Sequence, residues 1–436
     1  MPKTYRRIAI LGGASPLWSP RNIGYMATAR SCQGAEVVLV DLSLERAQDM
    51  ATVLTRMIQR AYPDARLAVR GAATLDEALP GADAVFTCYR NGSHDTEERI
   101  NAIARQYGSQ QSCFTAGPGA CLYLAVQGPV LIDLVRRMQR CCPDAWLVNC
   151  SNPLPAMVML AVKAGHHPRK VLGFCGALHW TRKLLARFLQ VPPERLEFRI
   201  GGTNHCTFIT EVYVDGRDAM PLLRQRGREQ KYFDLGIWGQ SSSEIRILNA
   251  IGWLCPGGHP TDILPTLHGD FLPREPGYSD PDEPMNNKLD YSPDFGRIVR
   301  EYADGKRDDW APPRQPDVPV SWLEALAGHG SERLFSINTT NLGAVPNLPD
   351  WTVPDLECYL DDRGVSPLVS PGLPEVIAET VRRHHVTFEI AARAVLARDG
   401  ALLREALQLC PFGDYFESAE SILRDARAVF GADLIF

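Results

Sequence analysis

The alternation of short apolar runs with amphipathic stretches predicts strands and helices in turn along the first 190 residues. The apolar runs at 7–11, 36–41, 81–88, 146–150 and 170–173 are short enough for buried strands. Apolar residues at helical spacing predict helices at 22–32, 44–62, 75–79, 97–107, 122–138 and 154–162. Strands that alternate with helices in this way are typical of a doubly wound parallel sheet.

The pattern changes after residue 194. Residues 196–200 and 207–214 read as antiparallel strands, with a turn at Asp215-Gly216. Helices are predicted at 244–254, 295–303, 374–397 and 418–430, and strands at 334–340 and 351–360. Residues 256–317 are rich in Pro, Gly and Asp and are predicted to be irregular. We therefore expect an α/β domain over residues 1–194 and an α+β domain over 195–436, with a cleft where they meet.

Composition excludes several classes of protein. The 436 residues carry a formal net charge of −5 without a long run of either sign, which argues against a nucleic-acid partner. The twelve cysteines are scattered and form no CxxC pair, so neither a disulfide framework nor a structural zinc site is expected. Neither a signal peptide nor an 18-residue apolar stretch is evident, so we expect a cytoplasmic protein with no membrane partner.

The ends of the first two predicted strands suggest a dinucleotide site. The turn Gly12-Gly13-Ala14-Ser15 follows the first strand, and glycines there let the backbone approach a pyrophosphate at a helix N-terminus. Asp41 ends the second strand, where an acid can bind both ribose hydroxyls and so favours NAD. Asp41 could instead cap the next helix, although Ser43 is equally placed for that role. We expect a Rossmann-type domain with Gly12, Gly13, Ser15 and Asp41 at the cofactor.

Two later strand ends carry further polar residues. Arg90 and Asn91 follow one strand, and Asn149 and Asn152 follow another, just before Pro153. Open α/β sheets bind ligands at this edge, and amides can bind ribose or sugar hydroxyls without adding charge. We expect Arg90, Asn91 and Asn149 at the cofactor and Asn152 at a substrate. The alternative is a turn stabilised by its own side chains.

Cys175 and His205 are the candidate metal ligands. Cys175 follows a predicted strand, and His205 lies between two predicted strands. A thiolate and an imidazole can ligate one divalent ion whose shell is completed by sugar oxygens, which would also place His205 at the substrate. The alternative is a core cysteine and a hydrogen-bonded histidine.

An ordered set of motifs resembles the family 4 glycoside hydrolases, a group of NAD-dependent glycosidases. The resemblance covers most of the chain. The matching segments are the Gly-Gly-x-Ser turn at 12–15, Arg90-Asn91-Gly92, Tyr107-Gly108, Gly117-Pro118-Gly119, Asn149-x-x-Asn152-Pro153, Gly173-x-Cys175, Asn204-His205, residues 341–349 and Leu373-Pro374-Glu375.

The resemblance implies a glycosidase that transiently oxidises its substrate. NAD⁺ takes a hydride from the sugar C3, which acidifies the C2 proton. A base removes that proton, the aglycone leaves C1, water adds, and NADH reduces C3 again. The residues matching Cys175 and His205 hold a manganese-type ion in the family, and a Lewis acid stabilises the enolate.

The chain departs from the family pattern at two positions. Gly176 follows the metal cysteine, where many members have an Asp, Asn or His. Ile263 stands at the position of the family's tyrosine base, in the segment 259–265. An isoleucine side chain neither donates nor accepts a proton. His259, Asp262 and His179 are therefore the remaining candidates for the catalytic acid and base, and the alternative for each is a structural role. The chain thus resembles a divergent branch.

The family's substrates commonly carry an anion at C6, and a divergent relative similarly acts on sulfoquinovosides. Trp18 and Arg21 are suited to bind such a sulfonate, unless Trp18 packs and Arg21 is solvated. We expect a C6-anionic hexoside, either a sulfoquinovoside or a hexuronide, ahead of a 6-phosphoglycoside. An NAD-dependent hydroxyacid or sugar dehydrogenase, built like lactate and malate dehydrogenases, and a non-catalytic NAD or sugar sensor remain alternatives. The resemblance also implies a homo-oligomer.

Overall fold

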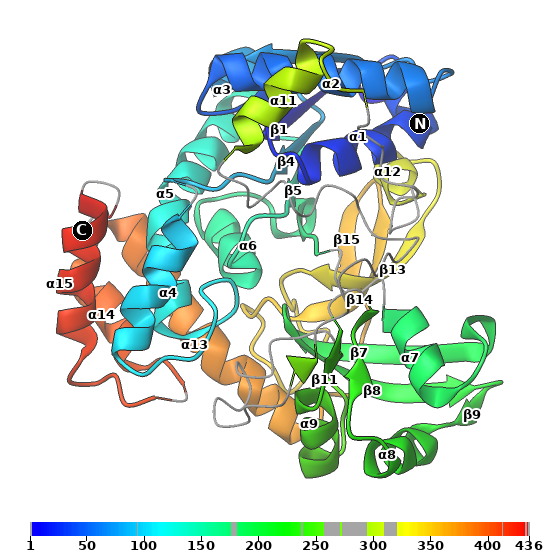
Figure 1. The fold of residues 1–436 in the computed structure, drawn as a ribbon, viewed down its shortest axis with the longest axis vertical. Helices are drawn as coiled ribbons and strands as arrows, with labels where there is room; N and C mark the ends of the chain where they lie inside the picture. The colour runs from blue at the N-terminus through cyan, green and yellow to red at the C-terminus, as the bar shows by residue number, and fades with distance from the viewer. Residues whose placement is uncertain are drawn as a thin grey trace.

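One long mixed sheet organises the molecule (Figure 1). The computed structural model describes residues 2–93, 95–175, 181–236, 239–256, 271–272, 294–308, 321–411, 413–431 and 434. The strands of the long sheet are β1 (Arg7–Leu11), β2 (Glu36–Val40), β3 (Ala68–Ala72), β4 (Ala84–Thr87), β5 (Trp146–Asn149), β6 (Val171–Gly173), β7 (Leu196–Thr203), β8 (Cys206–Val214), β9 (Arg217–Asp218), β13 (Glu332–Asn338), β14 (Asp355–Asp361) and β15 (Gly364–Pro367). Their order is β3-β2-β1-β4-β5-β6-β13-β14-β7-β8-β9, with β15 paired to β14.

The first six strands are parallel and β13 joins them antiparallel. The order reverses direction between β1 and β4, as in a doubly wound Rossmann-type sheet, so the predicted fold class is confirmed. The remaining strands, β10 (Phe233–Asp234), β11 (Gln240–Ser241) and β12 (Phe271–Leu272), form a small antiparallel sheet.

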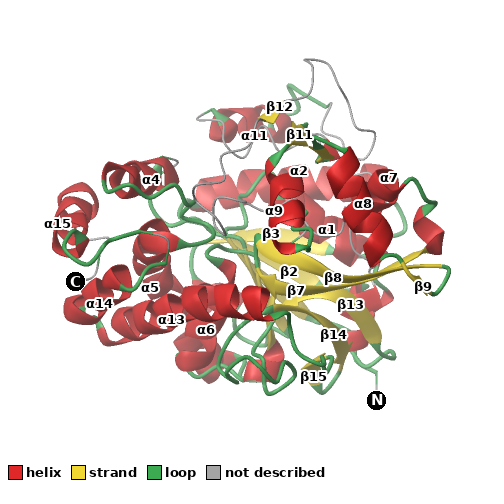
Figure 2. Cartoon of the chain, turned by 90° about the horizontal axis from the view of Figure 1, so that it is seen from below, coloured by secondary structure: helices red, strands yellow, loops and turns green. Residues whose placement is uncertain are grey.

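Helices cover both faces of the sheet. In the part of the chain that the structure describes, the α-helices are α1 (Trp18–Thr28), α2 (Leu44–Ala61), α3 (Leu75–Ala78), α4 (Thr96–Gln106), α5 (Gly117–Cys141), α6 (Leu154–Lys163), α7 (Thr181–Leu189), α8 (Met220–Glu229), α9 (Ser243–Ile251), α11 (Phe295–Ala303), α12 (Ser321–Leu326), α13 (Glu375–Ala397), α14 (Gly400–Gln408) and α15 (Ala419–Phe430). Figure 2 shows α1 and α2 on one side of the sheet and α6 and α13 on the other. Successive residues of β1 point into two different cores, Ile8 and Ile10 into one and Ala9 and Leu11 into the other, because side chains alternate along a strand.

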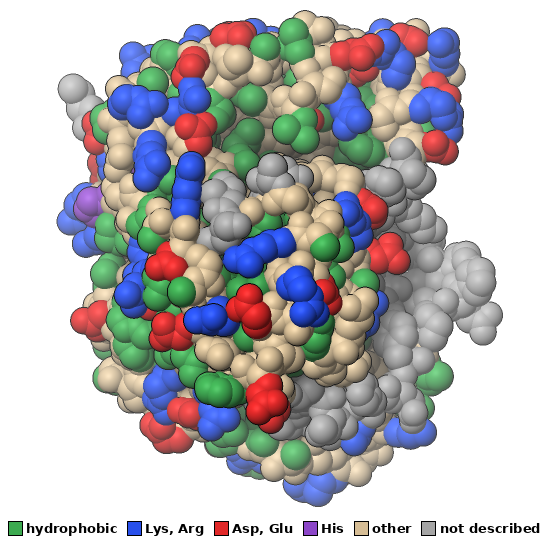
Figure 3. All heavy atoms as spheres, turned by 90° about the vertical axis from the view of Figure 1, so that its left-hand side faces the viewer, with side chains coloured by type: hydrophobic (Ala, Val, Ile, Leu, Met, Phe, Trp, Pro, Cys, Tyr) green, Lys and Arg blue, Asp and Glu red, His purple; other side chains and the backbone are tan. Residues whose placement is uncertain are grey.

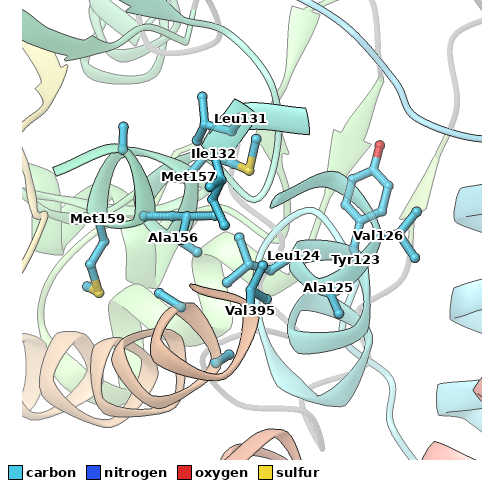
Figure 4. Close-up of a cluster of buried hydrophobic side chains, with 14 of the residues drawn as sticks. Tyr123, Leu124, Ala125, Val126, Leu131, Ile132, Ala156, Met157, Met159 and Val395 are labelled. Carbon is cyan, nitrogen blue, oxygen red and sulfur yellow. The ribbon is translucent and has the colours of Figure 1, made fainter. Parts of the chain in front are cut away.

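The core on the α6 side depends on close helix packing (Figure 4). A Cβ at Gly128 of α5 would lie 2.7 Å from Leu160 Cδ2 of α6 and 2.8 Å from Val395 Cγ1 of α13. Glycine at this position therefore lets the three helices meet. Helix α13 comes from the second half of the chain. The second half therefore supplies side chains to a core that also contains helices α5 and α6 of the first half.

The second half also continues the main sheet through β13. Its last helices, α14 and α15, pack beside α5 and α4. On the face that they form, acidic and basic side chains are interspersed (Figure 3). The division of the chain into domains at residue 194 stays a prediction.

Three predicted elements differ from the structure. The helix expected over 22–32 begins at Trp18, whose N–H donates to the Ser15 side chain, and it ends at Thr28 before a 3₁₀ turn. The turn expected at Gly117-Pro118-Gly119 is the first turn of α5, where proline is well tolerated. The strand expected over 351–360 begins only at Asp355.

Helix α5 also corrects the expectation that no long apolar stretch follows the N-terminus. Its 25 residues pass a length and hydropathy test for a membrane span, but 83% of the apolar window is buried inside the protein. Helix α5 is therefore a core helix of the protein, and it packs against α6 and α13.

Candidate functional site

The carboxyl ends of the parallel strands meet at one edge of the sheet. Gly12 follows β1, Asp41 follows β2, and Asn149 ends β5. The crevice between β1 and β4, where the strand order reverses, is the usual ligand site of such a sheet.

The glycine turn lies directly on the neighbouring strand ends. Gly12 has φ +81°, and a Cβ there would lie 2.5 Å from Tyr89 Cα. A Cβ at Gly13 would lie 2.6 Å from Leu39 Cβ. Both glycine N–H groups donate to the Val40 carbonyl, at 2.9 and 3.0 Å. Only glycine fits either position, so the turn packs closely against the neighbouring strands. Contact of this turn with a pyrophosphate stays a prediction.

Asp41 contacts both the glycine turn and the residues that lead into the next helix. Its Oδ2 accepts from the Ala14 N–H at 3.1 Å, and its Oδ1 accepts from the Leu42 N–H at 2.9 Å. The helix cap is Ser43, whose hydroxyl accepts from the Arg46 N–H. Burial raises the pKa of Asp41, against the lowering effect of its backbone hydrogen bonds. The capping role thus belongs to Ser43, and ribose binding by Asp41 stays a prediction.

Arg90 and Asn91 are fastened to α4 and α5. The Arg90 guanidinium lies 2.7 Å from Glu97, which also accepts from the Tyr123 hydroxyl at 2.8 Å. The Asn91 side chain donates to the Val126 carbonyl at 2.9 Å. These bonds fix the strand end; a cofactor contact by Arg90 or Asn91 stays a prediction.

Asn149 stabilises the turn in which it lies. Its Oδ1 accepts from the Thr87 hydroxyl at 2.7 Å and its Nδ2 donates to the Ser151 carbonyl at 2.9 Å. The peptide bond between Asn152 and Pro153 is cis. The turn-stabilising interpretation therefore holds for Asn149, and binding by Asn149 or Asn152 stays a prediction.

Trp18 and Arg21 contact each other near the end of β5. The Arg21 guanidinium lies over the Trp18 ring, 5.2 Å from its centre. Burial, followed by a charge on Cys175, raises the pKa of Cys150 to about 12, and the Arg21 charge acts in the opposite direction. Arg21 and Cys175 thus both lie within electrostatic range of Cys150, and anion binding by Trp18 and Arg21 stays a prediction.

A row of paired residues connects Cys175 to His205. Gly173 of β6 pairs with Asn338, Asn338 with Asp355, and Asp355 with Gly202 of β7. The two predicted ligands lie just beyond the ends of this row. Strand β13 contacts β7 as well as β14.

His205 occupies a tight turn between β7 and β8, with φ +63°. Among the residues that the structure describes, no three His, Cys, Asp or Glu side chains gather as a metal site. A divalent ion would therefore have a thiolate and an imidazole from the described chain, with the rest of its shell from substrate and water. This donor set suits a borderline transition-metal ion, and the shared ion stays a prediction.

The candidate acid–base residues His259, Asp262 and His179 lie outside the described residues. So do Gly176 and Ile263, the two departures from the family pattern.

Sequence reasoning missed a buried polar network behind the His205 turn. Asp355 is completely buried and bonds to Thr207 and Ser336. His385 of α13 lies 3.0 Å from the Thr203 hydroxyl. An acid within the predicted strand 351–360 was the available signal, because a carboxyl group is rarely buried without a partner.

Comparison with known proteins points to the family that the sequence motifs resemble. Residues 7–191 match the family 4 glycosyl hydrolase model, and residues 281–412 match the C-terminal domain of that family. The chain is 24% identical to an alpha-galactosidase of Bacillus subtilis over 98% of both sequences. It is 25% identical to an alpha-galacturonidase of Thermoanaerobacterium saccharolyticum, over 97% of this chain and 94% of that one.

Solved structures show the same fold. A 6-phospho-alpha-glucosidase from gut microorganisms, in complex with NAD and Mn²⁺, has a TM-score of 0.80 and 18% identity, with 99% of each chain covered. A malate dehydrogenase of Cryptosporidium parvum is more distant, with a TM-score of 0.52, 14% identity and coverage of 90% and 99%. The resemblance inferred from the order of the motifs is confirmed. The chain belongs to the family 4 glycosyl hydrolases.

Proposed function

We propose that the protein is an NAD-dependent glycosidase that cleaves a C6-anionic hexoside. The observation that carries the proposal is a family 4 chain whose glycine turn, Gly12-Gly13, lies at the strand ends and is bonded to Asp41 through the Ala14 N–H. A similar structure holds NAD and Mn²⁺, and the residues of this chain fit both groups.

The described residues have separate roles in this proposal. Gly12 and Gly13 bring backbone to the pyrophosphate, and Asp41 binds the ribose hydroxyls. Cys175 and His205 would hold the divalent ion, close to the sugar hydroxyls. Arg90 and Asn149 keep the neighbouring strand ends in place through the hydrogen bonds described above.

The bound cofactor and ion supply hydride transfer at C3 and stabilisation of negative charge on the sugar oxygens. The protein must orient C3 toward the nicotinamide and keep a base at C2. The base and acid would come from His259, Asp262 or His179. Because the hydride returns to the sugar, the reaction produces no net NADH.

The C6 group of the substrate is proposed from charge and from relatives. Arg21 over Trp18 offers a cation and an indole N–H, and the Arg21 charge acts on the same buried thiol, Cys150, as Cys175 does. These groups suit a carboxylate or sulfonate. A curated relative is named alpha-galacturonidase, which favours the hexuronide, and the sulfoquinovoside remains the second choice.

A panel of nitrophenyl glycosides tests the proposal. It contains α and β glucuronides, galacturonides, sulfoquinovosides and glucoside 6-phosphates, each with and without NAD⁺ and Mn²⁺. We expect nitrophenol release that requires NAD, without net NADH. Release from no member of the panel, while NAD still binds, would refute the proposal and favour the sensor. Net NADH from a free sugar acid would favour the dehydrogenase.

The proposal includes a cytoplasmic, homo-oligomeric enzyme, without nucleic-acid or membrane partners. Light scattering during size-exclusion chromatography measures the assembly. A molar mass of 48.3 kDa, which is that of a single chain, would contradict the homo-oligomer.

A further inference from the structure

Asp355 is a buried carboxyl group at the centre of three strands. It is completely buried in β14. Its Oδ1 lies 2.9 Å from the Ser336 hydroxyl of β13, and its Oδ2 lies 2.9 Å from the Thr207 hydroxyl of β8. Hydroxyl groups alone would stabilise a buried negative charge poorly, because neither carries a positive charge.

Counting hydrogens indicates which form of Asp355 fits the structure. The Thr207 oxygen lies 2.9 Å from Asp355 and also 2.9 Å from the Thr203 carbonyl. A hydroxyl has one hydrogen, and an ionised carboxylate has none to give. Both contacts are hydrogen bonds only when Asp355 carries the hydrogen: Asp355 donates to Thr207, and Thr207 donates to Thr203. Burial acts in the same direction, because it raises the pKa of Asp355 to about 6, so the neutral form predominates below that pH.

His385 secures the same turn from the opposite side. The Val353 N–H donates to His385 Nδ1 at 3.3 Å, so Nε2 carries the hydrogen of the neutral ring. Nε2 then donates to the Thr203 hydroxyl at 3.0 Å. Burial lowers the pKa of His385 to about 3, which keeps the ring neutral.

The two groups converge on Thr203, the last residue before the turn Asn204-His205. Its carbonyl is bound through Thr207 and its hydroxyl through His385. His205 has a left-handed backbone, which costs a non-glycine residue conformational energy and persists only when its surroundings hold it. The network therefore fixes the backbone that carries His205.

We propose that Asp355 and His385 are positioning residues, which act through Thr207 and Thr203 to hold His205 in its ligand-binding orientation. The ligand-binding role of His205 rests on the proposed function, whereas the effect on the turn does not. Neither Asp355 nor His385 is assigned a contact with substrate or cofactor.

Three variants separate this proposal from a purely structural role. Asp355→Asn keeps an acceptor for Ser336 and has a permanent hydrogen donor for Thr207. Thr207→Val removes the hydroxyl group with little change of shape, and Thr207→Ser is its matched control. The Kd for Mn²⁺ and the Kd for NAD are measured for each purified full-length protein at pH 7.

We expect Thr207→Val to weaken Mn²⁺ binding by about tenfold, the lower end of the effect of removing a group that orients a metal ligand. Asp355→Asn and Thr207→Ser should bind Mn²⁺ at least as tightly as the wild type, and all three should bind NAD unchanged. Equal Mn²⁺ affinity for Thr207→Val and wild type would overturn the proposal. So would a loss in Asp355→Asn as large as in Thr207→Val, because it would mean that the carboxylate charge is needed.

Amide hydrogen exchange in the metal-free protein tests the turn directly. Exchange at His205 and Cys206 should be faster in Thr207→Val and unchanged in Asp355→Asn. If the wild type binds no Mn²⁺, the proposed metal site fails, while this exchange still decides the positioning role. If Thr207→Val does not fold, Thr203→Val removes the hydroxyl group bound by His385 and serves in its place, with the same expected results.

Discussion

Asp355→Asn should change how the stability of the protein depends on pH. Burial raises the pKa of Asp355 from 3.8 to about 6 in the folded protein. A folded protein that binds the proton more tightly than the unfolded chain loses stability as pH rises. The contribution of Asp355 is complete below pH 3.8 and is lost as pH passes about 6. Asparagine occupies the same space without titrating.

The size of the effect follows from the shift. A shift of roughly two pKa units corresponds to about 3 kcal/mol, since one unit is about 1.4 kcal/mol. Between about pH 4.5 and 7.5, most of this change occurs, so the wild type should lose about 2 kcal/mol of unfolding free energy relative to Asp355→Asn. His385 and His166 act in the opposite direction, because burial lowers their pKa values to about 3 and about 4. Both histidines are present in both proteins, so the difference between the proteins isolates Asp355.

Urea unfolding followed by tryptophan fluorescence measures both proteins at each pH, and the buried Trp322 provides a core signal. The difference in unfolding free energy should move steadily in favour of Asp355→Asn between about pH 4.5 and 7.5. A difference that is constant with pH, or that moves in favour of the wild type, would refute a raised pKa. It would then follow that Asp355 is ionised in the folded protein throughout this pH range.

Three further results are expected. Gly12→Ala should abolish NAD binding measured by calorimetry, because its Cβ would lie 2.5 Å from Tyr89 Cα at φ +81°; retained affinity would show that the turn can move away from β4. Asp41→Ala should weaken NAD binding by about 10- to 100-fold, the usual effect of losing hydrogen bonds to a charged group. Ser43→Ala should leave NAD binding unchanged, but it should lower the free energy of unfolding by about 1 kcal/mol because a helix cap is lost. Equal NAD affinities for both variants would contradict this division of roles. Removal of divalent ions with a chelator should abolish glycoside cleavage without loss of NAD binding, and Mn²⁺ should restore it; full activity in metal-free protein would exclude the ion.

Local signals predicted much of the fold. Five of the six parallel strands were evident as apolar runs, because both faces of the sheet are covered. The exception is β3, an edge strand that is mostly half-exposed and contains Arg70 and Gly71. Arg70 pairs with Glu36 of β2, a contact that depends on the folded sheet. Edge strands of this kind lack the apolar run on which the prediction relies.

Local reasoning was less complete at the site. The sequence offered both Asp41 and Ser43 as the helix cap, and the structure assigns that role to Ser43 through a hydrogen bond three residues along the chain. The network around Asp355 was not predictable in this way. Asp355 and Thr207 are 148 residues apart, and only the antiparallel arrangement of β14, β7 and β8 brings them together. Buried polar networks between distant strands therefore require the structure.

Cleavage of the preferred glycoside in D₂O tests the central claim most directly. If the protein oxidises C3 and removes the C2 proton, the proton returned to C2 comes from solvent. NMR of the released sugar should then show deuterium at C2, in a reaction that requires NAD and yields no net NADH. Sugar released without deuterium at C2, from protein freed of NAD, would contradict the oxidation–elimination mechanism.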